Sequence, residues 1–269
     1  MNHSRAEKME AFGRLLDVMD ELREKCPWDK KQTMESLRNL TIEETYELVD
    51  AIIEKDLPGV KEELGDLLLH VVFYAKIGSE KEAFDIKDVI DHNCEKLIQR
   101  HPHIYGDVEV KDEQEVKQNW EKLKLKEGKK SVLSGVPSAL PALIKAYRIQ
   151  DKAGQIGFQW DDIRDVWAKV AEEVAELQQA ESQVGFKRRE ENMEEEFGDV
   201  LFALVNYARY VGIDPETALE KTNKKFIRRF QFIEDTAKRE KLDLEEMTLE
   251  QMDVFWEQAK SEEKKANSN

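Results

Sequence analysis

Acidic residues recur at helical spacing in this chain, and an apolar run follows them. In "EETYEL", Glu43, Glu44 and Glu47 lie three and four residues apart, so on a helix they share one side. In "EELGDLLLHVVFYA", Glu63 and Asp66 are three apart, and the aspartate directly precedes the apolar run. Carboxylates gathered beside a core repel one another or become neutral unless a cation lies among them. The pattern therefore predicts a cation site at the rim of a helical core.

The same acidic pattern returns in the second half of the chain. "EEVAEL" contains Glu172, Glu173 and Glu176, and "EEEFGDVLFALVNYA" contains Glu196 and Asp199 before another apolar run. In a chain with 58 acidic residues, a single EExxE is more commonly a solvated helix face. The recurrence of the whole pattern in the same order disfavours that interpretation.

Further blocks repeat in the same order, which indicates an internal duplication. "CPWD" at Cys26 corresponds to "FQWD" at Phe158, and "KLIQR" at Lys96 corresponds to "KFIRR" at Lys225. "NWEKLK" and "FWEQAK" close the two halves. Between the halves, "LKEGKKSVLSGVPSALPALIKAY" concentrates Gly, Pro and Ser, which is typical of a linker.

The elements that position the acids are predicted to be helices. Pro and Gly are scarce (6 and 12 residues), and no useful strand alternation is seen. We expect an all-α protein of two tandem duplicated bundles of the four-helix type. In each half, helices carry the EExxE, ExxD and KxxxR motifs, one helix precedes the Trp-Asp block, and a last helix carries Trp120 or Trp256. The predicted divisions are a first domain at 1–127, a linker at 128–138, a second domain at 139–262, whose first helix starts near Ser138, and a flexible tail at 263–269.

The residue types limit the identity of the cation. The second half contains no His and no Cys, so its predicted ligands are all oxygen atoms, which suits Mg²⁺, with Mn²⁺ as a substitute. No His has a Glu three residues before it, which disfavours a di-iron bundle. Magnesium held by carboxylates commonly brings substrate phosphates with it.

Basic residues follow the acids in both halves. Lys96 and Arg100 are four apart, as are Lys225 and Arg229, so each pair lies on one helix face and is a candidate phosphate clamp. Asn206 shares a helix face with Asp199 and interrupts an apolar run, where the first half has Phe73. Asn206 is either a core amide or a substrate contact, and we favour the second. Trp256 either stacks on a base or fills the core.

Composition restricts the partners and the location. A formal net charge of −16 disfavours binding to a nucleic-acid polymer. The start "MNHSRAEKME" has no apolar signal region, and the longest apolar runs are too short to span a bilayer. Two cysteines without a CxxC motif indicate neither a disulfide framework nor a zinc site. We expect a cytoplasmic protein that does not contact a membrane.

Taken together, the duplicated EExxE and ExxD motifs and the block "LREKCPWDKKQTMESL" resemble the MazG family of nucleoside triphosphate pyrophosphohydrolases, over nearly the whole chain. The resemblance implies an all-α fold, Mg²⁺ dependence, a homodimer, and hydrolysis between the α- and β-phosphates to a nucleoside monophosphate and pyrophosphate.

Site residues carried over by motif are as follows. The metal ligands would be Glu173, Glu176, Glu196 and Asp199 in the second half, and Glu44, Glu47, Glu63 and Asp66 in the first. Glu172 and Glu43 would orient or deprotonate the attacking water. Lys225 and Arg229, with Lys96 and Arg100 in the first half, would contact the phosphates, Asn206 would contact the substrate, and Trp256 would lie near the base.

Two alternatives remain open at the level of the sequence. One is a non-enzymatic acidic helical scaffold, which does not require the repeated KxxxR. The other is a phosphohydrolase of narrower specificity, for dUTP or for hyperphosphorylated guanosine nucleotides. The preferred base and sugar, the number of metal ions and the activity of the first half are not determined by these motifs.

Overall fold

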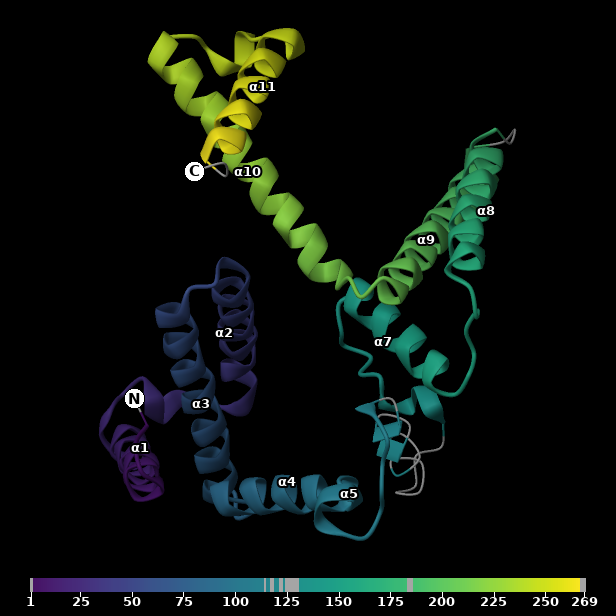
Figure 1. Ribbon diagram of the computed structural model, residues 1–269. Coiled ribbons are helices and arrows are strands. Elements are labelled where there is room, and N and C mark those ends of the chain that lie inside the picture. The colour runs from purple at the N-terminus through teal and green to yellow at the C-terminus, as the bar shows by residue number, and fades with distance from the viewer. Residues whose placement is uncertain are drawn as a thin grey trace. The chain divides into compact units, whose positions relative to one another are not determined.

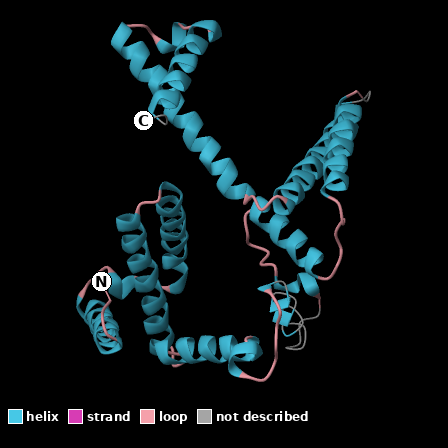
Figure 2. Ribbon diagram, in the orientation of Figure 1, coloured by secondary structure: helices cyan, strands magenta, loops and turns pink. Residues whose placement is uncertain are grey.

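The described part of the chain is built from helices joined by turns and by several longer loops (Figure 2). The computed structural model describes residues 2–113, 115–116, 119–120, 123, 131–182 and 186–266, and this part of the chain contains no strand. It divides into two compact units, Met1–Val116 and Lys117–Asn269. None of the described helices combines the length and the apolar character needed to cross a bilayer. The all-α, duplicated architecture predicted from the sequence is confirmed.

The first unit has a helical hairpin at its centre. Its elements are α1 (Arg5–Lys25), η1 (Asp29–Lys31), α2 (Met34–Glu54), α3 (Leu57–Glu80), α4 (Ile86–Arg100) and the short α5 (Pro102–Tyr105). Helices α2 and α3 form the hairpin, and α1 packs against α3 (Figure 1). Their shared core contains Met19, Leu37, Val72, Phe73 and Ile77.

Local signals in the sequence fix the ends of this hairpin. Thr33 caps α2: its hydroxyl oxygen accepts a hydrogen bond from the Ser36 amide, and the Ser36 hydroxyl oxygen accepts one from the Thr33 amide. Lys55 then adopts a left-handed conformation with φ 58°, and its amide donates to carbonyls of the last turn of α2. Pro58 lies in the first turn of α3, where its missing N–H costs nothing. The tight connection holds the EExxE helix beside the ExxD helix.

The second unit contains the longer helices. Its elements are η2 (Val132–Gly135), α7 (Ala142–Gln155), α8 (Ile163–Glu181), α9 (Phe186–Tyr210), α10 (Pro215–Glu240), η3 (Leu244–Glu246) and α11 (Leu249–Ala266). Helices α8 and α9 pair along their lengths, and α7 packs against α9 (Figure 1). Helices α10 and α11 pack together around Ile233, Ala237, Met247 and Phe255.

Several predicted boundaries differ from the observed ones. The helix expected near Ser138 begins at Ala142, because Pro141 is in an extended conformation (φ −51°, ψ 149°) and forms its N-terminal boundary. The expected tail at 263–269 is helical through Ala266, and Glu263 makes ion pairs there with α10. Most of the segment around Trp120 and the start of the predicted linker lie outside the described residues.

Candidate metal and nucleotide site

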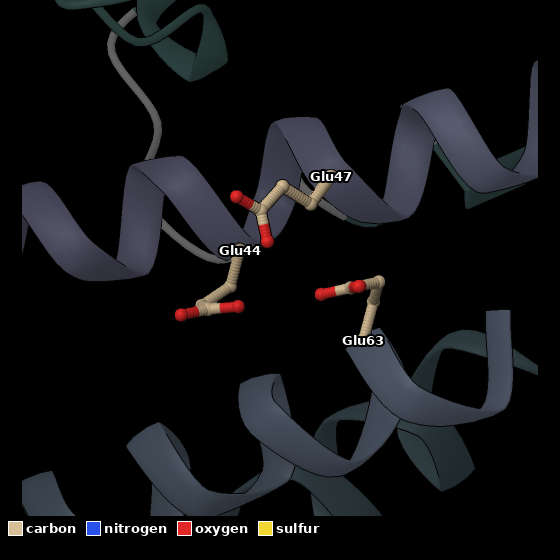
Figure 3. Close-up of side chains that lie close together, drawn as sticks. All are labelled: Glu44, Glu47 and Glu63. Carbon is tan, nitrogen blue, oxygen red and sulfur yellow. The ribbon is translucent and has the colours of Figure 1, made fainter. Parts of the chain in front are cut away.

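A carboxylate cluster forms in the first unit where α2 and α3 face each other (Figure 3). Glu44 and Glu47 come from α2, and Glu63 comes from α3. One carboxylate oxygen of each lies within 4.8 Å of those of the other two. Asp66, the fourth predicted ligand, is close enough to raise the pKa of both Glu44 and Glu63. The structure therefore brings the four predicted metal ligands of the first half together.

The electrostatics of this cluster favour a bound cation. Burial is the largest cause of the raised pKa of Glu44, followed by the charges of Asp66 and Glu47. Burial also raises the pKa of Glu63, and Glu47 and Glu44 add to it. Glu63 Oε2 is buried without a hydrogen-bond partner among the described residues. A buried acceptor without a partner destabilises a protein, and a cation would satisfy it.

A second cluster occupies the corresponding place between α8 and α9. It consists of Glu173, which is buried, with Glu196 and Asp199, again with one oxygen each within 4.8 Å. Glu176 lies beside it, and its pKa is raised first by a hydrogen bond with the Glu173 side chain and then by burial. All four predicted ligands of the second half thus belong to one neighbourhood.

Both clusters fit a hard divalent cation. They offer only carboxylate oxygens, the ligand type of Mg²⁺ and Mn²⁺. Two oxygens bound to one Mg²⁺ at about 2.1 Å are at most about 4.2 Å apart. Oxygen atoms already within 4.8 Å need only small side-chain rotations to reach that spacing.

Lys169 is a site residue that sequence reasoning missed. Its ammonium lies 2.7 Å from Glu172 Oε1 and 2.9 Å from Glu173 Oε1, and hydrogen bonds to these two carboxylates raise the pKa of Lys169. The signal was a lysine one helical turn before EExxE, since residues four apart on a helix face each other. The first half has Leu40 there, so only the second half holds its leading acid in this way.

A cavity of about 370 Å³ opens beside the second cluster. Its wall is mainly apolar and comes from α7, from the segment between α7 and α8, and from α8 and α9. Glu173, Asp199 and Asn206 also line it. The predicted substrate contact Asn206 is thus brought to the same place as the predicted metal ligands Glu173 and Asp199.

The corresponding position in the first unit is filled. Phe73, which stands where the second half has Asn206, is 2% exposed and packs in the core with Met19, Leu37 and Ile77. The difference between the halves is therefore one of shape as well as polarity.

In the part of the chain that the structure describes, no hydrogen bond or ion pair joins Lys225, Arg229 or Trp256 to the acids of the second cluster. Lys225 is exposed on α10, and Arg229 pairs with Glu263 at 2.7 Å and lies over the ring of Trp256, 5.4 Å from its centroid. Among the described residues that line the cavity, none belongs to α10 or α11. In the first unit, Lys96 and Arg100 are half-buried on α4, and Glu43 is exposed on α2.

Comparisons with known proteins agree with this geometry. The MazG nucleotide pyrophosphohydrolase domain matches the chain twice, at residues 32–105 and 163–232. These two ranges hold the two carboxylate clusters. The chain is 45% identical over 254 residues to a Thermotoga maritima protein named nucleoside triphosphate pyrophosphohydrolase/pyrophosphatase MazG, covering 93% of this chain and 95% of that protein.

Two further relatives extend the match. A nucleoside triphosphate pyrophosphohydrolase of Escherichia coli K12 is 40% identical over 262 residues, which are 95% of this chain and 99% of the relative. The uncharacterised protein YabN of Bacillus subtilis is 48% identical over 260 residues, and the chain spans 53% of its length. With both carboxylate clusters inside the matched ranges, the chain belongs to the MazG family of nucleoside triphosphate pyrophosphohydrolases.

Proposed function

We propose that the second unit hydrolyses nucleoside triphosphates between the α- and β-phosphates with Mg²⁺, for which Mn²⁺ can substitute. The products are a nucleoside monophosphate and pyrophosphate. The observation that carries the proposal is the convergence of Glu173, Glu196 and Asp199 from two helices at the edge of a cavity. The cytoplasmic location expected from the sequence is part of this proposal.

The acidic residues divide into two roles in this proposal. Glu173, Glu176, Glu196 and Asp199 hold the metal, which when bound neutralises phosphate charge and makes water more acidic. Glu172 orients the attacking water and accepts its proton. The contact between Glu172 and Lys169 fixes the position of that carboxylate. In the first unit, Glu44, Glu47, Glu63 and Asp66 would hold a metal in the same way, with Glu43 as the leading acid and Lys96 and Arg100 as the basic pair.

The direct test is a panel of NTPs and dNTPs with Mg²⁺, in which pyrophosphate and orthophosphate are measured separately. We expect pyrophosphate and monophosphate in equal amounts as the primary products. Orthophosphate and diphosphate as primary products would contradict the proposed bond. Activity confined to dUTP or to hyperphosphorylated guanosine nucleotides would establish the narrower specificity instead.

We also propose that the protein is a homodimer whose sites combine two copies of the chain. The predicted phosphate clamp, Lys225 and Arg229, lies on α10, which contributes nothing to the described cavity wall. Apolar side chains on α8 and α9 are exposed, among them Trp167, Phe197 and Leu201. An apolar face of this kind is typical of an interaction surface. A second copy would cover it and could bring its own clamp to the acids. Trp256, under Arg229, would then lie near the nucleotide as well.

Mixing two inactive variants tests this dimer. Glu196→Ala removes an acid, and Arg229→Ala removes the clamp, so each homodimer should be nearly inactive. If each site takes its acids from one copy and its clamp from the other, random mixed dimers contain one intact site and the mixture regains about one quarter of wild-type activity. Subunit exchange is first verified with two affinity tags. Mixed dimers without recovered activity would show that acids and clamp act within one chain.

A further inference from the structure

The cavity beside the second cluster carries two buried side-chain amides in a wall that is mainly apolar away from the acids. Gln150 on α7 is 7% exposed, and Asn206 on α9 is 9% exposed. Its volume of about 370 Å³ falls in the range of small-molecule sites. Polar groups set in an apolar pocket usually fix the orientation of a ligand. The question is which hydrogen-bonding groups these two amides present.

The orientation of the Gln150 amide is fixed by a partner that can only accept. Gln150 Nε2 donates to the carbonyl oxygen of Phe202 at 2.8 Å, and a carbonyl cannot donate in return. The amide nitrogen must therefore face α9. The other end, Oε1, is buried and has no hydrogen-bond partner among the described residues. A buried acceptor of this kind is costly unless a donor reaches it.

The orientation of the Asn206 amide is fixed by a partner that can only donate. Asn206 Oδ1 accepts from Arg209 Nε at 3.2 Å and from Nη2 at 3.1 Å. A guanidinium has no acceptor, so Asn206 must turn its oxygen toward Arg209 and keep Nδ2 as the group that can donate to a ligand. Arg209 is itself held by Gln159 Oε1 at 3.2 Å and by the ring of Tyr210. The wall thus offers one oriented acceptor and one oriented donor.

Aromatic rings complete the pocket. Phe158 and Trp160 belong to its wall, yet the Phe158 side chain is 82% exposed. Rings of this kind beside oriented amides suit a flat heterocycle, because a planar base can stack on them while its edge meets hydrogen-bonding groups. Glu173 and Asp199 line the same cavity. A nucleotide whose base lies in the cavity would therefore place its phosphates, which the sugar links to the base, beside these acids.

We propose that this cavity is the nucleobase pocket of the second unit and that Gln150 sets base preference. Gln150 Oε1 accepts a hydrogen bond from an N–H on the edge of the base, and Asn206 Nδ2 donates to the acceptor beside it. The inference rests on the proposed function and adds to it the residues that distinguish one base from another. The first unit lacks the second of these amides, since Phe73 stands at the position of Asn206 and is buried in the core. That half is therefore expected to lack base discrimination.

The experiment compares Gln150→Leu with a matched control, Gln155→Leu. Gln155 is on the same helix, and its Oε1 is also buried without a partner, but Gln155 is not among the residues that line the cavity. The substrates are pairs that differ by one N-methyl group on the base edge, namely UTP with N3-methyluridine triphosphate and GTP with N1-methylguanosine triphosphate. Both pairs are assayed with the wild type and with each variant.

We expect the wild type to lose at least about tenfold in kcat/KM on methylation, because the methyl group removes the donor that Gln150 accepts. In Gln150→Leu, the kcat/KM values of the unmethylated and methylated substrates should differ by no more than about threefold, whereas Gln155→Leu should keep the wild-type difference. Asn206→Leu provides a second variant, which should also change the ratios between bases if the pocket is correctly assigned.

The possible results separate this inference from the proposed function. If Gln150→Leu and Asn206→Leu hydrolyse NTPs with the discrimination of the wild type, the base lies elsewhere and the pocket assignment is wrong, while the proposed function stands. A wild type that hydrolyses no nucleoside triphosphate would instead overturn the proposed function. If Gln150→Leu does not fold, the Asn206→Leu ratios decide the assignment.

Discussion

Replacing Asp199 with asparagine is expected to lower kcat by about three orders of magnitude, since one lost metal ligand removes several kcal/mol of transition-state stabilisation. Asp199 is the exposed member of the second cluster and shares it with Glu173 and Glu196. The amide keeps the shape of the side chain but carries no charge to attract the cation. The measurement is single-turnover hydrolysis of the best NTP over a range of Mg²⁺ concentrations.

The helices should persist in this variant. Removing one charge from a cluster of carboxylates relieves repulsion, so the apparent melting temperature without metal should change by only a few degrees. Mg²⁺ should raise the melting temperature of the wild type by mass action, and the variant should lose the share of that rise that comes from the second unit. This second measurement tests metal binding independently of catalysis.

Asp165→Asn is the matched control for Asp199→Asn. Asp165 is exposed in the first turn of α8, outside the cluster, and undergoes the same chemical change. We expect it to keep near-normal turnover and the full effect of Mg²⁺ on melting. If Asp199→Asn also keeps near-normal turnover at limiting Mg²⁺, Asp199 is not a ligand.

The acidic clusters could be predicted from the sequence because they depend on local geometry. Helical periodicity puts Glu44 and Glu47 on one side of α2, and a tight turn at Lys55 brings α3 back beside it with Glu63. Both the periodicity and the short connection are visible in the order of residues. The same reasoning applied to the second half identified Glu173, Glu196 and Asp199.

Other parts of the site depend on tertiary packing, and no local pattern reveals them. Gln150 looks like any polar residue of an amphipathic helix until α7 is packed on α9 and its nitrogen meets the Phe202 carbonyl. The pairing of Arg229 with Glu263 depends on how α10 meets α11. The sequence did indicate that Asn206 and Phe73 stand at corresponding positions. Only the packed structure shows that Asn206 lines a cavity and that Phe73 is buried in a core.

The two halves can be compared directly by removing one carboxylate from each cluster. Glu63→Ala and Glu196→Ala delete the α3 and α9 glutamates that face the EExxE helix, so the two variants lose the same charge at corresponding places. We expect Glu63→Ala to retain most turnover and Glu196→Ala to lose nearly all of it. The measurement is the rate of pyrophosphate release by both proteins, assayed side by side with the same NTP.

The physical reason for this order lies in what surrounds the acids, since both units gather carboxylates that could hold a cation. The second cluster is paired with Lys169 and opens onto a cavity lined by Asn206, whereas in the first unit Phe73, at the position of Asn206, is packed in the core. Loss of Glu63 also removes a buried oxygen without a partner, so that variant should not lose stability on this account. Equal losses of turnover would mean that both sites work or that the halves are coupled. A greater loss in Glu63→Ala would assign the activity to the first unit and would show that a filled position 73 does not prevent catalysis.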